Sequence, residues 1–196
     1  MVTLAIVAAL VLPACTGGTR STGRPPSGAG AVAGRIVVTK EVDGDTIRVR
    51  IGGAPEERVR FIGVDTPETH GPGGLRECFG QEAARRTAEL IPIGTEVRLV
   101  RDAEARDKYG RLLAYVYRAR DGLFVNLSLA QEGFAAALTI PPNVAHADEF
   151  VKAAADARTA GRGLWGRCGG PDTPITQQSA LGPAPPEASL RYRRGP

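Results

Sequence analysis

Two short segments of the chain gather side-chain oxygens that could bind a hard divalent cation. They read Asp43-Gly44-Asp45-Thr46 and Val64-Asp65-Thr66-Pro67-Glu68-Thr69. Asp45 and Asp65 each offer a carboxylate, and a backbone carbonyl near Thr66 could join them. Oxygen ligands without His or Cys favour Ca²⁺ or Mg²⁺ over Zn²⁺. Glu68 lies three residues past Asp65, where it could orient or deprotonate a water molecule as a general base.

Two arginines could supply the positive charge that a phosphate group needs. Arg60 precedes the second acidic segment, and Arg111 ends a third segment, Asp107-Lys108-Tyr109-Gly110-Arg111. A planar guanidinium can bind phosphate oxygens at two points and stabilise the negative charge that develops during cleavage. Each arginine also has a plain structural explanation, because Arg60 could be an exposed strand residue and Arg111 could pair with Asp107. Five residues with complementary roles in neighbouring motifs favour the chemical explanation.

The order and spacing of the three segments resemble those of the thermonuclease family, whose best-known member is staphylococcal nuclease. The resemblance runs from about Val37 to Trp165. It implies a Ca²⁺-dependent enzyme that hydrolyses phosphodiester bonds in DNA and RNA and leaves 3′-phosphate ends. Little sequence preference is expected, because an OB-type groove contacts the backbone more than the base edges.

The resemblance also implies a role for each matching residue. The expected catalytic residues are Arg60, Glu68 and Arg111, and the expected metal ligands are Asp45, Asp65 and Thr66. Lys108 and Tyr109 would contact the terminal phosphate of a bound nucleotide, and an exposed loop explains the same two residues equally well. One departure is the stretch Ala137–Pro142, which has no Tyr where the best-known member has aromatic residues flanking the base. Substrate affinity or base preference is therefore expected to differ.

Two other functions account for parts of the sequence. A non-catalytic nucleic-acid-binding module could share the fold, but it would not need the general base or the metal ligands. A surface domain could bind Ca²⁺ for structural reasons, but it would not need Arg60 and Arg111. Because all of these positions are filled, the nuclease is the prediction.

The elements that must position these residues lie within 35–170, where we expect an α+β fold. The expected strands are Arg35–Thr39, Thr46–Ile51, Arg58–Val64, Thr95–Val100 and Leu112–Tyr117. The expected helices are Phe79–Ile91, Asn126–Gln131 with Asn126 as its N-cap, and Ala147–Ala160. Five short strands with three packed helices predict an OB-fold-like antiparallel β-barrel.

The spacing of Arg60 and Asp65 creates a geometric problem for this site. The two residues are five positions apart, so strict alternation would place their side chains on opposite faces of a strand. If both belong to one site, the strand must bulge or end between Phe61 and Asp65. Gly63 is the natural place for that interruption.

The two ends of the chain differ in composition from the predicted domain. Residues 1–14 are uncharged and apolar, which is typical of an export signal. Cys15 follows Ala14 as in a bacterial lipoprotein cleavage box, with an ordinary signal or an uncleaved anchor as alternatives. Residues 16–34 read as a flexible tether and residues 171–196 as a disordered tail. We expect an exported monomer that contacts the membrane only through a lipid on Cys15.

Two further cysteines and the distribution of charge complete the sequence prediction. Cys78 and Cys168 form an even pair once Cys15 is lipidated, and export permits a disulfide between them; two buried thiols are the alternative. The net charge of +4 lies mostly in the ends, because residues 35–170 hold 20 basic and 19 acidic residues. The nucleic-acid prediction therefore depends on where Arg60 and Arg111 lie, and not on bulk charge.

Overall fold

The structure is a computed structural model that describes residues 30–70 and 76–173. The predicted signal, the lipidation site at Cys15, residues 16–29 of the predicted tether and the tail beyond residue 173 lie outside these residues. None of the helices within them is long and apolar enough to cross a membrane.

Five short strands close into a barrel, and most of them alternate so that one face is buried inside it. They are β2 (Ile36–Asp43), β3 (Thr46–Ile51), β4 (Glu56–Phe61), β6 (Glu96–Arg101) and β7 (Leu112–Arg118). The strand order is β6-β2-β3-β4-β7, and pairing of β6 with β7 completes the ring. A short strand, β1 (Gly30–Ala31), extends the sheet beside β6. The predicted five-stranded α+β barrel is confirmed, although β4 and β7 pair in parallel.

The core fills the barrel and continues under the helices. Alternate residues of the barrel strands point inward and are almost completely buried. The central ones are Ile47, Val49, Val59, Phe61, Leu99, Ala114 and Val116. This packing makes the barrel the rigid support for any side chain on its outer face.

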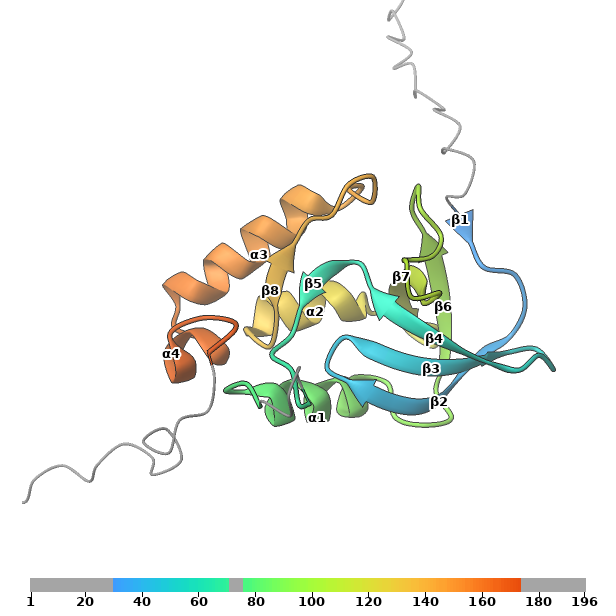
Figure 1. The fold of residues 1–196 in the computed structure, drawn as a ribbon, viewed down its shortest axis with the longest axis horizontal. Helices are drawn as coiled ribbons and strands as arrows, with labels where there is room; N and C mark the ends of the chain where they lie inside the picture. The colour runs from blue at the N-terminus through green and yellow to red at the C-terminus, as the bar shows by residue number, and fades with distance from the viewer. Residues whose placement is uncertain (1–29, 71–75, 174–196) are drawn as a thin grey trace, which may run out of the picture.

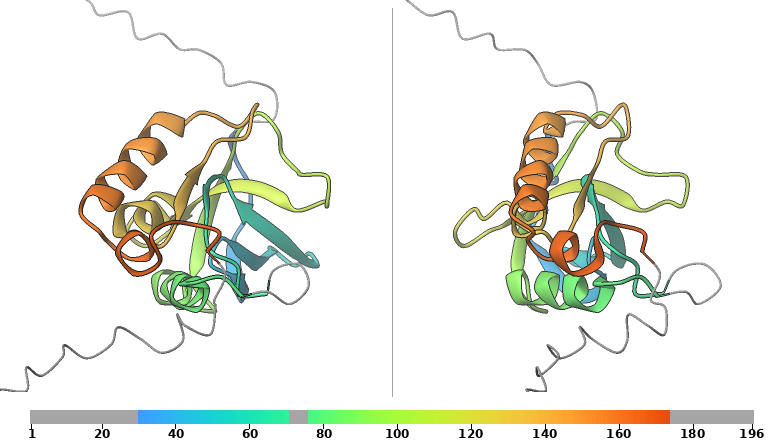
Figure 2. Two further views of the ribbon diagram at one scale, coloured as in Figure 1. Left: turned by 60° about the vertical axis from the view of Figure 1, so that its left-hand side comes forward. Right: turned by 90° about the vertical axis from the view of Figure 1, so that its left-hand side faces the viewer.

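The helices cover one end and one side of the barrel (Figures 1 and 2). They are α1 (Gly80–Leu90), α2 (Val125–Glu132), α3 (Ala147–Thr159) and the short α4 (Leu164–Cys168). Helix α1 packs against β2, and α2 lies between β7 and α3. The three predicted helices are present to within a residue at each end, and α4 was not expected.

Asn126 does not cap α2, so that prediction is wrong. The helix begins at Val125, and Phe124 occupies the N-cap position. The Asn126 side chain is fully buried; it accepts a hydrogen bond from the backbone of Val116 (2.9 Å) and donates one to the carbonyl of Ile62 (2.9 Å). Because an amide both donates and accepts, Asn126 fastens β7 to the residue that follows β4.

The predicted interruption between Arg60 and Asp65 is confirmed by the strand boundaries. Strand β4 ends at Phe61, and a new strand, β5 (Gly63–Asp65), pairs with β8 (Ala136–Leu138) in a separate two-stranded sheet. Gly63 has a φ of +85°, and a Cβ atom there would collide with the ring of Phe150. Only glycine tolerates both conditions, so Gly63 lets the chain change direction at this point.

Candidate active site

Arg60 brings the two predicted metal-binding carboxylates together. Its guanidinium lies 3.0 Å from Asp45 Oδ2 and 2.5 Å from Asp65 Oδ1. Asp45 is buried and Asp65 is partly exposed. The strand break at Gly63 explains how Arg60 and Asp65 meet despite their odd spacing.

Asp45 also links the first acidic segment to the second. Its Oδ1 accepts a hydrogen bond from Thr46 Oγ1 (3.0 Å), and its Oδ2 accepts one from the backbone of Thr66 (3.0 Å). Gly44 packs so closely that a Cβ atom would lie 2.6 Å from Thr66 Oγ1. Thr87 of α1 donates a hydrogen bond to the Gly44 carbonyl. The Asp-Gly-Asp turn is therefore held from two sides.

The oxygen atoms at this point suit a hard divalent cation. Asp45 and Asp65 meet at one guanidinium, and the buried Thr66 Oγ1 has no hydrogen-bond partner in the described residues. Within 30–70 and 76–173, no three His, Cys, Asp or Glu side chains gather as a ready metal cluster. A cation here would therefore depend on two carboxylates and neutral oxygens, which is a donor set that Ca²⁺ accepts.

Glu68 lies beside this group and is held by its backbone. Its N–H donates to Glu77 Oε2 (2.8 Å), and its carbonyl accepts from the Glu77 N–H (3.0 Å). A Cβ atom on Gly80 would lie 2.7 Å from the Glu68 carbonyl, so the start of α1 packs directly on this segment. Burial, with a hydrogen bond to Asp43 and the charges of Asp43 and Asp45, raises the pKa of Glu68 to about 7. Such a pKa suits a group that accepts a proton near neutral pH.

A groove of about 530 Å³ opens beside Arg60. Its charged and aromatic lining includes four of the predicted residues, Arg60, Arg111, Lys108 and Tyr109. Asp45, Asp65 and Glu68 do not line it. Arg60 is therefore the residue that connects the acidic cluster to the groove.

Arg111 pairs with Asp107, the structural arrangement that the sequence allowed. Its Nε lies 2.6 Å from Asp107 Oδ2, and its backbone N–H donates to Asp107 Oδ1 (2.9 Å). Among the described residues its terminal guanidinium nitrogens make no hydrogen bond, so they can bind a ligand in the groove. The Tyr109 ring is 70% exposed and lies near both Lys108 Nζ (5.1 Å) and the Arg111 guanidinium (5.6 Å).

Comparison with known proteins agrees with this arrangement. Residues 58–167 match the family described as "Staphylococcal nuclease homologue". The chain belongs to this family. It is 40% identical over 131 residues to the thermonuclease of Staphylococcus intermedius, a match that covers 67% of this chain and 76% of that one.

Two Bacillus subtilis relatives of the family are longer than the matched region. The SPbeta prophage-derived endonuclease YokF is 37% identical over 135 residues, covering 68% of this chain and 45% of that protein. Endonuclease YncB is 36% identical over 135 residues, covering 68% of this chain and 63% of that one. The chain therefore spans about half to two thirds of these two relatives.

An aliphatic wall occupies the part of the groove where the sequence lacks tyrosines. Leu138 and Ile140 line it, and Ile140 is 59% exposed. Asn143 joins this wall to Glu104, another lining residue, because its side chain accepts from the Glu104 N–H (2.7 Å) and donates to the Glu104 carbonyl (3.1 Å). This protein therefore presents aliphatic side chains, and not tyrosines, at Leu138 and Ile140 of the groove.

The sequence did not predict two residues that support the site, Glu77 and Asp102. Glu77 holds the backbone of Glu68. Asp102 is buried and accepts hydrogen bonds from Tyr115 Oη (2.8 Å) and the Ala145 N–H (2.9 Å), which ties the β6–β7 connection to the segment before α3. No local pattern marks Asp102, because these two partners, unlike the adjacent Ala103, lie 13 and 43 residues away in the sequence.

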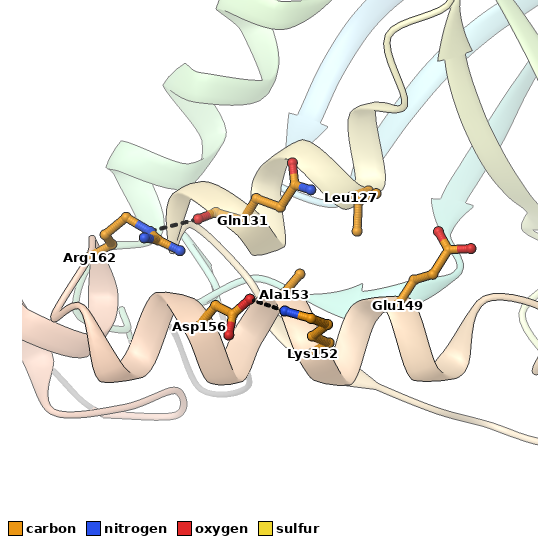
Figure 3. Close-up of a pocket in the computed structure, with 7 residues that line it drawn as sticks. All are labelled: Leu127, Gln131, Glu149, Lys152, Ala153, Asp156 and Arg162. Atoms are coloured by element: carbon orange, nitrogen blue, oxygen red, sulfur yellow. Dashed lines mark hydrogen bonds and ion pairs between the residues drawn. The ribbon is translucent and has the colours of Figure 1, made fainter.

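A second cavity, of about 270 Å³, lies between α2 and α3 (Figure 3). Its lining consists of Leu127, Gln131, Glu149, Lys152, Ala153, Asp156 and Arg162. Lys152 pairs with Asp156 (2.6 Å), and Arg162 donates to the Gln131 carbonyl (2.8 Å). This cavity contains none of the predicted site residues, and its cations already bind partners.

Cys78 and Cys168 form a disulfide in the structure. Cys78 lies just after Glu77, and its backbone N–H donates to the Thr173 carbonyl (2.7 Å). The bond therefore joins α4 to the segment that holds Glu68.

Proposed function

We propose that this protein is a Ca²⁺-dependent nuclease that hydrolyses phosphodiester bonds of DNA and RNA with little sequence preference and leaves 3′-phosphate ends. The observation that carries the proposal is the position of Arg60, which contacts Asp45 and Asp65 and also lines the groove shared with Arg111. The printed names of the relatives, a thermonuclease and two endonucleases, agree with it.

The residues that would hold the Ca²⁺ are Asp45, Asp65 and an oxygen of Thr66. When bound, the ion would neutralise phosphate charge and lower the pKa of a water molecule. Ca²⁺ accepts irregular shells of oxygen ligands, which suits carboxylates that come from two separate segments. This assignment is supported by the buried Thr66 Oγ1, which has no hydrogen-bond partner among the described residues, and by the bond from the Thr66 backbone to Asp45.

The remaining residues would bind and activate the reactants. Glu68 would accept a proton from the attacking water, whose oxygen forms a bond to phosphorus as the bond to the 5′ oxygen breaks. Arg111 lines the groove, and its terminal nitrogens, which make no hydrogen bond within the described residues, would bind the phosphate oxygens. Lys108 and Tyr109 line the same groove and would contact the terminal phosphate of the bound nucleotide.

Digestion of DNA and RNA in Ca²⁺ and in chelator tests the proposal. Glu68→Gln keeps the shape of the side chain but removes the base, so we expect kcat to fall about 10²- to 10⁴-fold. Glu82→Gln, at a carboxylate exposed on α1, is the matched control and should keep wild-type activity. Activity that survives chelation, or an unchanged kcat in Glu68→Gln, would contradict the proposal.

The same proposal includes export, with Cys15 as the lipidated first residue of the mature chain and no other membrane contact. Mass spectrometry of the chain produced in a bacterial host tests it. We expect a mature N-terminus at Cys15 that carries a lipid mass, and a Cys15→Ser variant without that mass. A mature chain that retains residues 1–14, or that begins elsewhere, would rule the lipid anchor out.

A further inference from the structure

The outer face of β2, β3 and β4 carries a row of cations. Lys40 pairs across the strands with Arg48, and Arg48 pairs with Arg58. Directly paired residues of neighbouring strands point to the same face, and all three side chains are exposed. The row therefore crosses three strands without interruption.

A β-bulge in β2 is what places Lys40 in this row. Val38 is buried opposite Val49, so regular alternation would also bury the residue two positions later. The register shifts between Val38 and Lys40 instead, and the extra residue turns Lys40 outward. The irregularity thus adds a third cation beside Arg48.

The row continues directly from the candidate active site. Arg58 and Arg60 are two residues apart on β4, and the β3–β4 pairing has no register shift. The two arginines therefore leave the same face, about 7 Å apart along the strand. Arg58 and Arg111 also lie close to each other. Val59 and Leu112 are the first pair of the parallel strands β4 and β7, and Arg58 and Arg111 immediately precede them in the chain.

Little negative charge balances the row. Glu56 lies 3.6 Å from Arg48 and 3.4 Å from Arg50, in ion pairs that are largely exposed and therefore weak. Lys40 and Arg58 have no ion pair within the part of the chain that the structure describes. Like charges directly opposite one another destabilise a sheet, and a polyanion laid across them would relieve the repulsion.

We infer that Lys40, Arg48 and Arg58 bind backbone phosphates of a nucleic-acid chain whose cleaved bond lies at Arg60. The inference rests on the proposed function and extends it, because a row that leads away from the site contacts a polymer but not a dinucleotide. Continuity with the groove favours a nucleic acid over an anionic membrane as the partner of this face.

A charge-neutralising variant tests the inference on the full chain. Lys40→Gln/Arg48→Gln/Arg58→Gln is compared with Arg85→Gln/Arg120→Gln/Lys152→Gln, which removes three exposed cations elsewhere. For single-stranded DNA of about 30 nucleotides, the row variant should show a KM raised roughly tenfold with kcat unchanged, and a salt slope smaller by about 2. Cleavage of a dinucleotide should match that of the wild type, and the control variant should match the wild type on both substrates.

Three results would overturn the inference. They are an unchanged KM for the long DNA, an equal loss on the dinucleotide, and unchanged DNA kinetics with a loss of binding to phosphatidylglycerol vesicles. Failure of the proposed function would be seen separately, as a wild-type protein that cleaves neither substrate. In that case the inference is tested by fluorescence anisotropy of labelled DNA. The row variant must bind the DNA more weakly than the control variant does, and equal binding would contradict the inference.

Discussion

Arg60 has four partners within the described part of its own chain. It donates hydrogen bonds to Asp65 and to the carbonyls of Phe61 (3.0 Å) and Val64 (2.8 Å), and it forms an ion pair with Asp45. The two carbonyls flank the strand break, so the side chain stabilises the same irregularity that lets it reach Asp65. An ammonium group could not reproduce this pattern, because it lacks the planar fork of a guanidinium.

Arg60→Lys should therefore keep the charge and still disable the site. We expect kcat to fall about 10²- to 10³-fold, as for loss of an oriented donor to developing charge. The free energy of unfolding should fall by about 1–3 kcal/mol, since the buried Asp45 carboxylate loses a partner. Steady-state kinetics and urea unfolding measure the two effects.

Arg86→Lys provides the comparison for this substitution. Arg86 makes a bidentate pair with Glu132 on the surface between α1 and α2 (2.6 and 3.0 Å), away from the groove. Its replacement should leave kcat unchanged. An Arg60→Lys enzyme with wild-type kcat would remove Arg60 from the catalytic residues.

At the scale of elements, the direction of the chain changes between β4 and β5, and the site depends on that change. Gly63 allows it through a positive φ and through its contact with the Phe150 ring of α3. Asn126 of α2 holds the intervening residue, Ile62, by its carbonyl. Two helices thus fix the break that brings Asp65 to Arg60.

Gly63→Ala should be strongly destabilising. The new methyl group meets Phe150 and the backbone stays at positive φ, so we expect a loss of about 2–4 kcal/mol in the free energy of unfolding. Gly122→Ala is the control, because Gly122 has a φ of +72° with open space around its Cα, and it should lose only about 1 kcal/mol. Equal losses in the two variants would show that packing on Phe150 contributes nothing.

The cation row predicts a stability gain from a single substitution. Arg48 lies directly between Lys40 and Arg58, and its ion pair with Glu56 is exposed and weak, so Arg48→Thr should raise the free energy of unfolding by about 0.2–1 kcal/mol. Arg50 lies opposite Glu56, so Arg50→Thr should not stabilise. Thermal and urea unfolding of the two variants give the comparison, and a destabilised Arg48→Thr protein would contradict the repulsion.

At the scale of the whole molecule, the sequence was sufficient for the barrel and for the grouping of Arg60 with Asp45 and Asp65, because both leave local patterns. Strand alternation marks β3, a run of Leu, Val and Tyr marks β7, and the motif around Asp65 marks the acidic cluster. The bonds that hold the site leave no such pattern. Asn126 resembles a helix cap in the sequence, and β8 is three small or apolar residues whose partner strand lies more than 70 residues earlier.

The disulfide joins regions that are far apart along the chain. It closes a separation of 90 residues between Cys78 and Cys168. Cys78→Ser/Cys168→Ser should lower the free energy of unfolding by about 3–5 kcal/mol, since the unfolded chain loses that constraint. Urea unfolding of the oxidised wild type and the variant tests this, and a loss below about 1 kcal/mol would contradict the expected constraint.

The same bond changes the result of a cut in the backbone. Lys108 lies in an exposed loop between the two cysteines, and cleavage after it by a trypsin-like protease would divide the chain there. Both pieces would stay joined through Cys78 and Cys168, and the hydrogen bonds between β6 and β7 would hold the new ends near each other. A nicked molecule would therefore run as one species on a non-reducing gel and as two after reduction, and proteolysis alone would not separate the segment that holds Glu68 from the C-terminal helix.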